Sequence, residues 1–228
     1  MTQRRRADRS NEPDPPATAG QRVDPGRRRF LGGLAGGAGA LLLPARPWAQ
    51  GTGSRSLRFF RIGTASTAGT YYPIGGIIAN AISNPPGSRS CDTGGSCGVP
   101  GLIAVVQSTE GSVANVHAIH EGGLDSGFAQ ADVAFWAYKG QGLFADRGPM
   151  ESLRAIANLY PEALHLVVRR DAGVLDVEDL AGKRISLDRE GSGTRVDAEL
   201  ILKAYGLSPD ALAQASSLPA GQAADAVR

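Results

Sequence analysis

From residue 57 onward, short apolar runs alternate with segments in which apolar residues recur every three or four positions. A short apolar run predicts a strand, and a recurrence of three to four predicts a helix. The expected strands are residues 57–63, 102–107, 127–130, 153–159, 164–168 and 184–187. Because strands that alternate with helices form βαβ units, the pattern predicts an α/β fold with a mainly parallel sheet.

The helices expected between these strands cover residues 73–82, 113–119, 132–139 and 194–204, with a helical turn at 176–180. Pro73 suits the first turn of the first helix, and Ser112 suits the N-cap of the second. The apolar face expected for the first helix is Ile74, Ile77, Ile78 and Ile82, and that of the last helix is Val196, Leu200 and Ala204.

The N-terminal part of the chain has the pattern of an export signal. Residues 27–31 read RRRFL, and residues 31–43 are all apolar or Gly. A pair of arginines before a weakly hydrophobic, Gly-interrupted run resembles the twin-arginine export signal of bacteria. The apolar run is too short to span a bilayer, which needs about 20 residues. We therefore expect a signal peptide and disordered N-terminus in residues 1–50, a cut near Ala49, and a periplasmic protein.

The charge balance changes at the same place. Residues 1–50 carry a net charge of +5, whereas residues 51–228 carry −3. A slightly acidic mature chain lacks the basic surface that binds nucleic acid or anionic lipid. We expect neither of these partners.

Four strand-to-helix junctions consist mostly of small or polar residues, and three of them are rich in Gly, Ser and Thr. They are residues 63–76 (GTASTAGTYYPIGG), 107–115 (QSTEGSVAN), 128–132 (FAQAD) and 191–194 (GSGT). In open α/β sheets, ligands bind at the carboxyl ends of strands, where helix N-termini present free amides. Backbone amides and hydroxyl groups bind a carboxylate well, so these junctions predict an anion site.

These junctions, with LYPEALHLVV at 159–168 and LAGKRISLDREGSGTR at 180–195, resemble the TAXI family of TRAP-transporter solute receptors. The order and spacing match from about residue 57 to the chain end. The chain departs from the family pattern at Ala68–Gly69, where a glycine pair is common, and at Ala114, where an acid is usual. The resemblance implies a periplasmic binding protein of type II, with one α/β lobe in residues 51–168 and part of a second in 169–228.

The resemblance also implies a function without catalysis or a cofactor. Such a receptor captures a small organic anion, such as a dicarboxylate or an amino acid like glutamate, and hands it to a TRAP permease. It meets the membrane only through that permease. The alternative is a receptor that serves an ABC importer, because receptors of both transporter types share this fold. The expected ligand-binding residues are Thr64, Ser66, Thr67, Thr70, Tyr71, Ser112, Asn115, Gln130, Ser192, Gly193, Thr194 and Arg195. The Arg195 guanidinium offers a carboxylate two parallel hydrogen bonds.

Cys91 and Cys97 enclose the sequence DTGGS in a chain expected to reach an oxidising compartment. Their even number and close spacing predict a local disulfide. Two thiols without a nearby His do not form a metal site, and none is expected.

The run around Ser96 (GGSCG) matches the GxSxG pattern of serine hydrolases, which leaves a secreted hydrolase as the rival function. A nucleophile elbow follows a strand and opens a helix. Ser96 instead follows a polar loop and precedes an expected strand, so we expect no catalysis there.

The last residues, 222–228, form a helical pattern without a C-cap glycine or a polar tail. Together with the resemblance, this predicts a C-terminally truncated chain in which the second lobe is incomplete. Since closure of two lobes supplies most ligand contacts, we expect such a chain not to bind ligand tightly.

Overall fold

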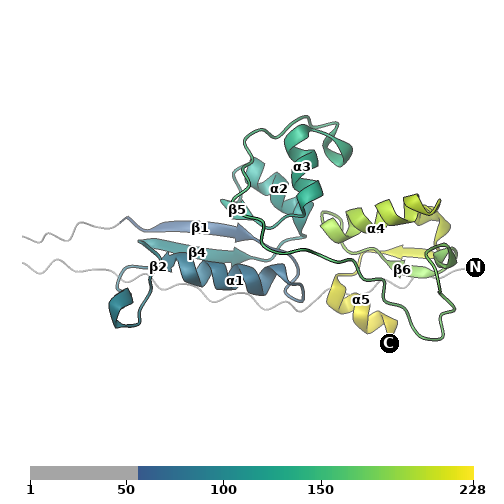
Figure 1. Ribbon diagram of the computed structural model, residues 1–228, viewed down its shortest axis with the longest axis horizontal. Coiled ribbons are helices and arrows are strands. Elements are labelled where there is room, and N and C mark those ends of the chain that lie inside the picture. Colours follow the sequence, from purple (N-terminus) through teal and green to yellow (C-terminus); the bar gives the residue numbers. More distant parts are fainter. Residues whose placement is uncertain (1–55) are drawn as a thin grey trace, which may run out of the picture. The chain divides into compact units, whose positions relative to one another are not determined.

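A computed structural model describes residues 56–228 of the protein (Figure 1). The predicted export signal, the cut near Ala49 and the N-terminal stretch lie outside the described residues. We divide the described chain into a first region (residues 56–153), a connecting segment (154–170) and a second region (171–228). Over this described range, no helix is long and apolar enough to cross a membrane.

The first region is built on a three-stranded parallel sheet. Strand β1 (Arg58–Gly63) lies in the centre, between β4 (Leu102–Gln107) and β5 (Ser126–Gly127). The last residue of β1 is paired with the last residue of both neighbours. The carboxyl ends of all three strands therefore meet at one edge of the sheet. The predicted parallel α/β arrangement is confirmed.

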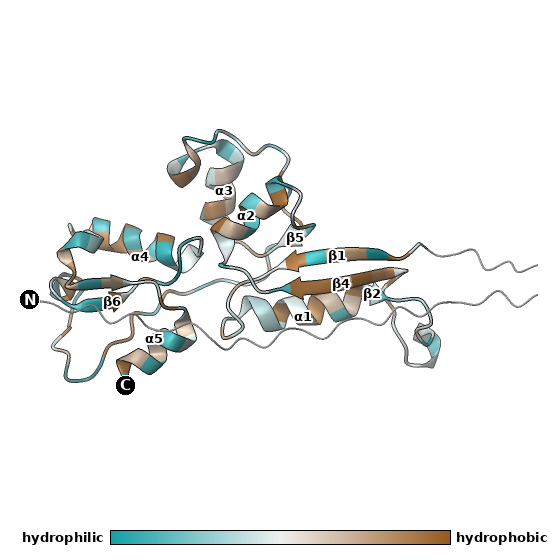
Figure 2. Cartoon of the chain, turned by 180° about the vertical axis from the view of Figure 1, so that it is seen from behind, coloured by the Kyte–Doolittle hydropathy of each residue, from teal (hydrophilic) through white to brown (hydrophobic). Residues whose placement is uncertain are grey.

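Helix α1 (Tyr71–Ile82) covers one face of this sheet, and Figure 2 shows the largely apolar colouring of β4 and the mixed colouring of β1 beside it. Ile74, Ile78 and Ile82 pack around the buried Ile62, as the four-residue spacing predicts. Ile77 does not belong to this face, because 67% of its surface is exposed. The sequence prediction was wrong at this one position, because Ile77 lies about 100° around the helix axis from the centre of the face formed by Ile74, Ile78 and Ile82.

Helices α2 (Ser112–His120) and α3 (Ala131–Lys139) form a second apolar cluster in the first region. Its buried members are Val116, Val133, Ala137, Phe144 and Met150. A short 3₁₀ turn, Gly142–Phe144, follows α3 and buries the Phe144 ring in the cluster.

Ser112 was expected to cap α2 and instead is its first helical residue. The N-cap is Gly111, whose φ of 125° is a conformation that residues with a side chain rarely adopt. The Ser112 hydroxyl is thereby released from capping.

A disulfide-bridged loop extends from the sheet between β2 (Ser83–Asn84) and β3 (Val99–Pro100), which pair in parallel. It contains a 3₁₀ turn, Cys91–Thr93. Cys91 and Cys97 form the predicted disulfide. Ser96 comes after this turn and before β3, so the order of elements is the reverse of a nucleophile elbow.

The second region contains a parallel pair of strands, β6 (Arg184–Ser186) and β7 (Gln214–Ser216). Each strand leads into a helix, β6 into α4 (Gly193–Ala204) and β7 into α5 (Ala220–Val227). The 3₁₀ turns Glu178–Leu180 and Pro209–Ala211 precede the strands. The first of these turns and the β6–α4 unit follow the sequence prediction, whereas β7 and the second turn were not foreseen.

The core of the second region consists of four leucines, Leu180, Leu187, Leu202 and Leu212. Ala198 packs against them, so the buried face of α4 runs through positions 198 and 202. The expected face with Leu200 was wrong, because 44% of Leu200 is exposed. Several apolar residues of α4 compete for the core, and the contacts with other elements decide which face is buried.

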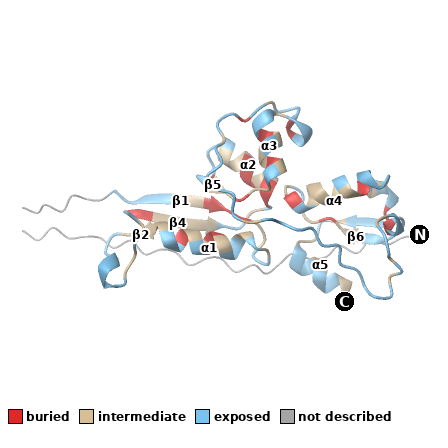
Figure 3. Cartoon of the chain, in the orientation of Figure 1, coloured by how far each residue is buried: buried red, intermediate tan, exposed pale blue. Residues whose placement is uncertain are grey.

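The connecting segment contains neither of the two strands predicted there, at 153–159 and 164–168. Figure 3 shows it as a largely exposed strip, and Ile156 and Val167 are 84% and 68% exposed. Its apolar residues have the spacing that is typical of a strand. A strand, however, also needs a neighbouring strand whose backbone groups pair with its N–H and C=O groups. No strand within residues 56–228 pairs with this segment.

Candidate functional site

The loops at the carboxyl edge of the first sheet are fastened together by one buried asparagine. The Asn115 Nδ2 atom donates to the carbonyls of Thr64, at 2.7 Å, and Phe128, at 2.8 Å. Its Oδ1 atom accepts the Thr109 hydroxyl at 2.7 Å. Asn115 has no exposed surface. One side chain therefore joins the loops that follow β1, β4 and β5.

Thr64 strengthens the same network. It is fully buried, and its hydroxyl donates to the Gln107 carbonyl at 2.8 Å. Its own carbonyl accepts the Asn115 side-chain amide and lies 2.8 Å from the Thr109 hydroxyl, whose single proton is donated to Asn115 Oδ1. Because buried polar groups are costly unless they are hydrogen-bonded, this network fixes the loop geometry behind the site.

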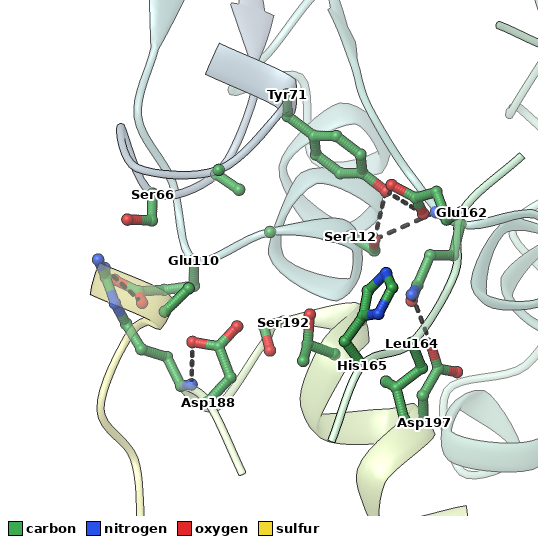
Figure 4. A pocket seen from close by; sticks show the side chains of 18 of the residues that line it. Ser66, Tyr71, Glu110, Ser112, Glu162, Leu164, His165, Asp188, Ser192 and Asp197 are labelled. Carbon is green, nitrogen blue, oxygen red and sulfur yellow. Dashed lines mark hydrogen bonds and ion pairs between the residues drawn. The ribbon is translucent and has the colours of Figure 1, made fainter. Parts of the chain in front are cut away.

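A cavity of about 250 Å³ opens in front of these loops (Figure 4). This volume lies near the lower limit of small-molecule pockets, which is about 300 Å³. The cavity is lined by Ala65, Ser66, Gly69, Tyr71, Glu110, Gly111, Ser112, Gln130, Glu162, Ala163, Leu164, His165, Asp188, Arg189, Ser192, Gly193, Thr194, Asp197 and Ala220. The first region, the connecting segment and the second region all contribute to it.

The N-terminus of α4 presents free donors to the cavity. The Ser192 hydroxyl caps the helix by accepting the Arg195 amide at 3.0 Å. The amides of Gly193 and Thr194 have no acceptor within residues 56–228. A helix N-terminus with open amides and a partial positive charge favours a carboxylate.

The N-terminus of α2 was expected to offer the same chemistry, and its amides are already occupied. Val113 and Ala114 donate to the Gly191 carbonyl of the second region at 3.0 and 3.1 Å. The loops before α2 and α4 approach so closely here that a Cβ on Gly111 would lie 3.1 Å from the Ser192 Cα. This helix end therefore binds a peptide carbonyl instead of a ligand.

Two side-chain contacts reinforce this approach. The Arg189 guanidinium forms an ion pair with Glu110 at 2.8 Å, and the Gln130 Nε2 atom donates to Asp197 at 2.6 Å. Burial raises the pKa of Asp197, and the nearby charge of Asp132 acts in the same direction. Asp188, between β6 and α4, has a φ of 71°, a strained conformation that Asp tolerates better than most residues.

Tyr71, Ser112 and Glu162 point toward one another in Figure 4. The Tyr71 hydroxyl donates to Glu162 at 3.0 Å and lies 3.5 Å from the Ser112 hydroxyl. Burial raises the pKa of Tyr71, so the phenol stays protonated and remains a donor. The Ser112 oxygen also accepts the Gln130 amide at 3.1 Å.

The structure brings most of the predicted ligand-binding residues to the cavity. Those that line it are Ser66, Tyr71, Ser112, Gln130, Ser192, Gly193 and Thr194. Thr64 and Asn115 are buried behind the residues that line the cavity, and their polar groups form the hydrogen bonds of the loop network. Their direct contact with a ligand was a wrong expectation, and they act as supports.

Thr67, Thr70 and Arg195 lie outside the lining. The Arg195 guanidinium forms an ion pair with Glu199 at 2.9 Å and is thereby directed along α4. Arg195 and Glu199 are four positions apart in the sequence, a spacing at which opposite charges commonly pair on a helix face.

Sequence reasoning missed all six residues of the lining that can carry a charge, namely Glu110, Glu162, His165, Asp188, Arg189 and Asp197. Glu162 and His165 belong to LYPEALHLVV, which was interpreted as a strand. The interruption of an apolar run by charged or polar residues was the signal that this segment lines a cavity. Within the described part of the chain, no group of three or more His, Cys, Asp or Glu side chains is placed to hold a metal ion.

The profile of the NMT1-like family matches residues 62–228, from β1 to the end of α5. The match includes all the elements that line the cavity.

Proposed function

Because the chain belongs to the NMT1-like family, a family of solute-binding proteins similar to periplasmic binding proteins, we propose that it is the receptor of a TRAP-type transporter of the TAXI kind. Proteins of such families typically bind a solute and are not enzymes. The proposed receptor captures a small organic anion and delivers it to a membrane permease. Membership of the family supports solute binding in general, and the TAXI motifs support the type of transporter.

The open N-terminus of α4 is the observation that carries the proposal. The free amides of Gly193 and Thr194 face a cavity whose other wall holds the hydroxyls of Ser66, Tyr71 and Ser112. Donors on two sides suit a carboxylate. We place the ligand between two lobes, residues 51–168 and 169–228, whose approach is held by the Gly191 carbonyl on α2.

Titration calorimetry tests the ligand class. A homologue with two complete lobes is titrated with L-glutamate, L-glutamine, 2-oxoglutarate and succinate. We expect heat of binding with at least one of the carboxylates and a weaker response when the residue that matches Thr194 is replaced by Pro, which removes one of the two open amides. Absence of binding to every small carboxylate would refute an anion receptor.

The type of transporter is a separate question, since the family match applies equally to a receptor of an ABC importer. We expect the adjacent genes to encode a TRAP permease with many membrane helices. A neighbouring ATPase gene together with an ABC permease gene would favour the importer instead.

We also propose a periplasmic location. The RRRFL run supports it, and so does the Cys91–Cys97 disulfide, since disulfides persist in oxidising compartments. A fusion of residues 1–55 to a reporter should be exported, and replacing Arg27, Arg28 and Arg29 by Lys should retain the reporter in the cytoplasm. Export of the triple Lys variant at the original rate would contradict a twin-arginine signal.

A further inference from the structure

Two histidines of α2 contact the segment that follows α3, residues 140–153. The His117 ring lies against the ring of Phe144, with a centroid separation of 5.2 Å, and Phe144 has no exposed surface. Three residues further along α2, the His120 Nδ1 atom lies 3.2 Å from the Ser152 hydroxyl. Neither histidine lines the cavity, so the proposed solute binding does not account for them.

The packed position of His117 suits a neutral ring only. Its Nδ1 atom is buried and has no hydrogen-bond partner among residues 56–228. A neutral imidazole avoids an unpaired donor there by carrying its proton on Nε2, whereas the imidazolium ion carries a proton on both nitrogens. Protonation would therefore bury an N–H donor without an acceptor, on a ring that has become charged. Both changes are costly away from water.

The charges around His117 act in both directions, and burial has the largest influence. Burial lowers the pKa of His117, and the nearby charges of Arg147 and His120 lower it further. Glu121 and the C-terminal end of α2, which both favour a cation, oppose this without reversing it. The other charged residues of the elements packed here are Asp132 and Lys139 in α3 and Asp146 and Glu151 in the 140–153 segment.

The 140–153 segment has few other attachments to the first region. The Gln141 and Met150 amides donate to the carbonyls of Trp136 and Ala137, both at 2.9 Å. The side chains of Phe144 and Met150 are buried in the cluster between α2 and α3, and most other residues of the segment are exposed. A segment with few buried contacts opens at a lower free energy than the core does.

We infer that His117 is a pH-sensitive switch, whose protonation releases the 140–153 segment from α2 while the sheet and α1 stay folded. The released segment leads directly into the connecting segment, which supplies part of the cavity wall. The inference concerns the fold, so it holds whether or not the cavity binds the proposed solute.

The direction of the effect follows from proton linkage. The pKa of His117 is lower in the packed state than in the released state, where the ring reaches water. The released state therefore binds more protons, and the packed state loses stability as the pH falls below about 6.5, the ordinary value for His. This range lies above the ordinary pKa of carboxyl groups, so Asp and Glu contribute little to it.

Amide hydrogen exchange on the full chain, followed from about pH 7.5 to pH 5, tests the inference. Protection factors, which are corrected for the pH dependence of the exchange chemistry, are compared at the amides of Gln141, Phe144 and Met150. We expect them to fall with pH by up to about tenfold per unit, the slope of a single proton. The amides of β1 and β4 should keep their protection.

Two variants remove the proton site in different ways. His117→Phe keeps an aromatic ring against Phe144 and cannot ionise, so the protection of the segment should no longer depend on pH. His117→Gln gives the same expectation with a polar side chain and serves if the Phe variant does not fold. Arg147→Gln removes a cation that disfavours protonation, so the loss of protection should begin at a higher pH.

His120→Gln is the matched control, because it removes the exposed histidine from the same helix and the same contact segment. It should keep the pH slope of the wild type. Constant protection of the wild-type segment over this pH range would overturn the inference. A slope that survives in the His117 variants and vanishes in His120→Gln would also overturn it, since the titrating group would then be His120.

Discussion

The N-termini of α2 and α4 look alike in sequence, but only the amides of the α2 end are occupied by another part of the protein. Each follows a parallel strand through a loop of Gly and Ser, and each was expected to offer amides to an anion. The amides of α2 are taken by the Gly191 carbonyl, whereas Gly193 and Thr194 of α4 face the cavity. A helix end therefore becomes a ligand site only where the rest of the fold leaves it open.

The supports of the two helix ends also differ. The end of α2 rests on the buried network around Asn115. The end of α4 is attached to the first region through the Gly191 carbonyl and two partly exposed polar pairs, Arg189–Glu110 and Gln130–Asp197. We expect the α2 side to be rigid and the α4 side to be the part that moves when ligand binds.

The largest expected effect is a loss of stability at the α2 end, which is expected to be the rigid side. Asn115→Leu removes the donors of two buried carbonyls and the acceptor of the Thr109 hydroxyl. It should lower the free energy of unfolding by about 3 kcal/mol, because buried polar groups then lose their partners. Chemical denaturation of the purified protein measures it. Asn80→Leu, at an exposed position of α1, is the control and should cost under about 0.5 kcal/mol. Similar losses in both variants would show that Asn115 is not a central support.

A smaller effect is expected where the two regions meet. Gly191 has a φ of 86°, and a Cβ there would lie 3.3 and 3.4 Å from the Cβ atoms of Glu110 and Ala114. Gly191→Ala should destabilise the protein by about 2 kcal/mol and weaken ligand binding, since it adds crowding to backbone strain.

Gly206→Ala is the control for Gly191→Ala. Its φ of 72° gives comparable strain, and the space around it is empty. It should cost about 1 kcal/mol by denaturation and leave ligand affinity unchanged. Equal effects on affinity would mean that the Gly191 contact does not hold the regions together.

The pH dependence of the Gln130–Asp197 bridge should be modest. Burial raises the pKa of Asp197 in the folded protein above its unfolded value. For such a group, the stabilising contribution is present below the unfolded pKa and is lost as pH rises through the folded pKa. Asp197→Asn, which cannot ionise, should therefore gain stability relative to wild type as the pH increases from about 3 to 7. Denaturation at several pH values measures the difference, and a constant difference would contradict a raised pKa.

The smallest effect is expected for the partly exposed ion pair. Arg189→Met removes the link to Glu110 and should cost about 0.5 kcal/mol at low salt, decreasing as salt screens the charges. Arg169→Met removes a local ion pair, to Asp171, that does not join the regions. Ligand affinity should depend on salt less steeply in Arg189→Met than in Arg169→Met. The same salt dependence in both variants would argue against a role of Arg189 in closure.

Local patterns predicted much of the fold. The apolar run at residues 102–107 coincides with β4, and the predicted helix at 132–139 differs from α3 by one residue. The disulfide between Cys91 and Cys97 was predicted from their separation of six positions along the chain. These features depend on neighbours along the chain, so their signal is present in the sequence itself. The strands expected at 153–159 and 164–168 failed because pairing needs a partner elsewhere.

The sequence by itself determined which residues form the β1 and β4 strands, where the α4 helix begins, and that Gly, Ser and Thr gather at the strand ends. Only the tertiary structure decided which polar groups at the strand ends are free to bind a ligand. Glu110 and Arg189 are 79 positions apart and Tyr71 and Glu162 are 91 apart. Hydrogen bonds between such distant residues leave no periodic trace in the chain, because they depend on how packed elements meet and not on local propensity.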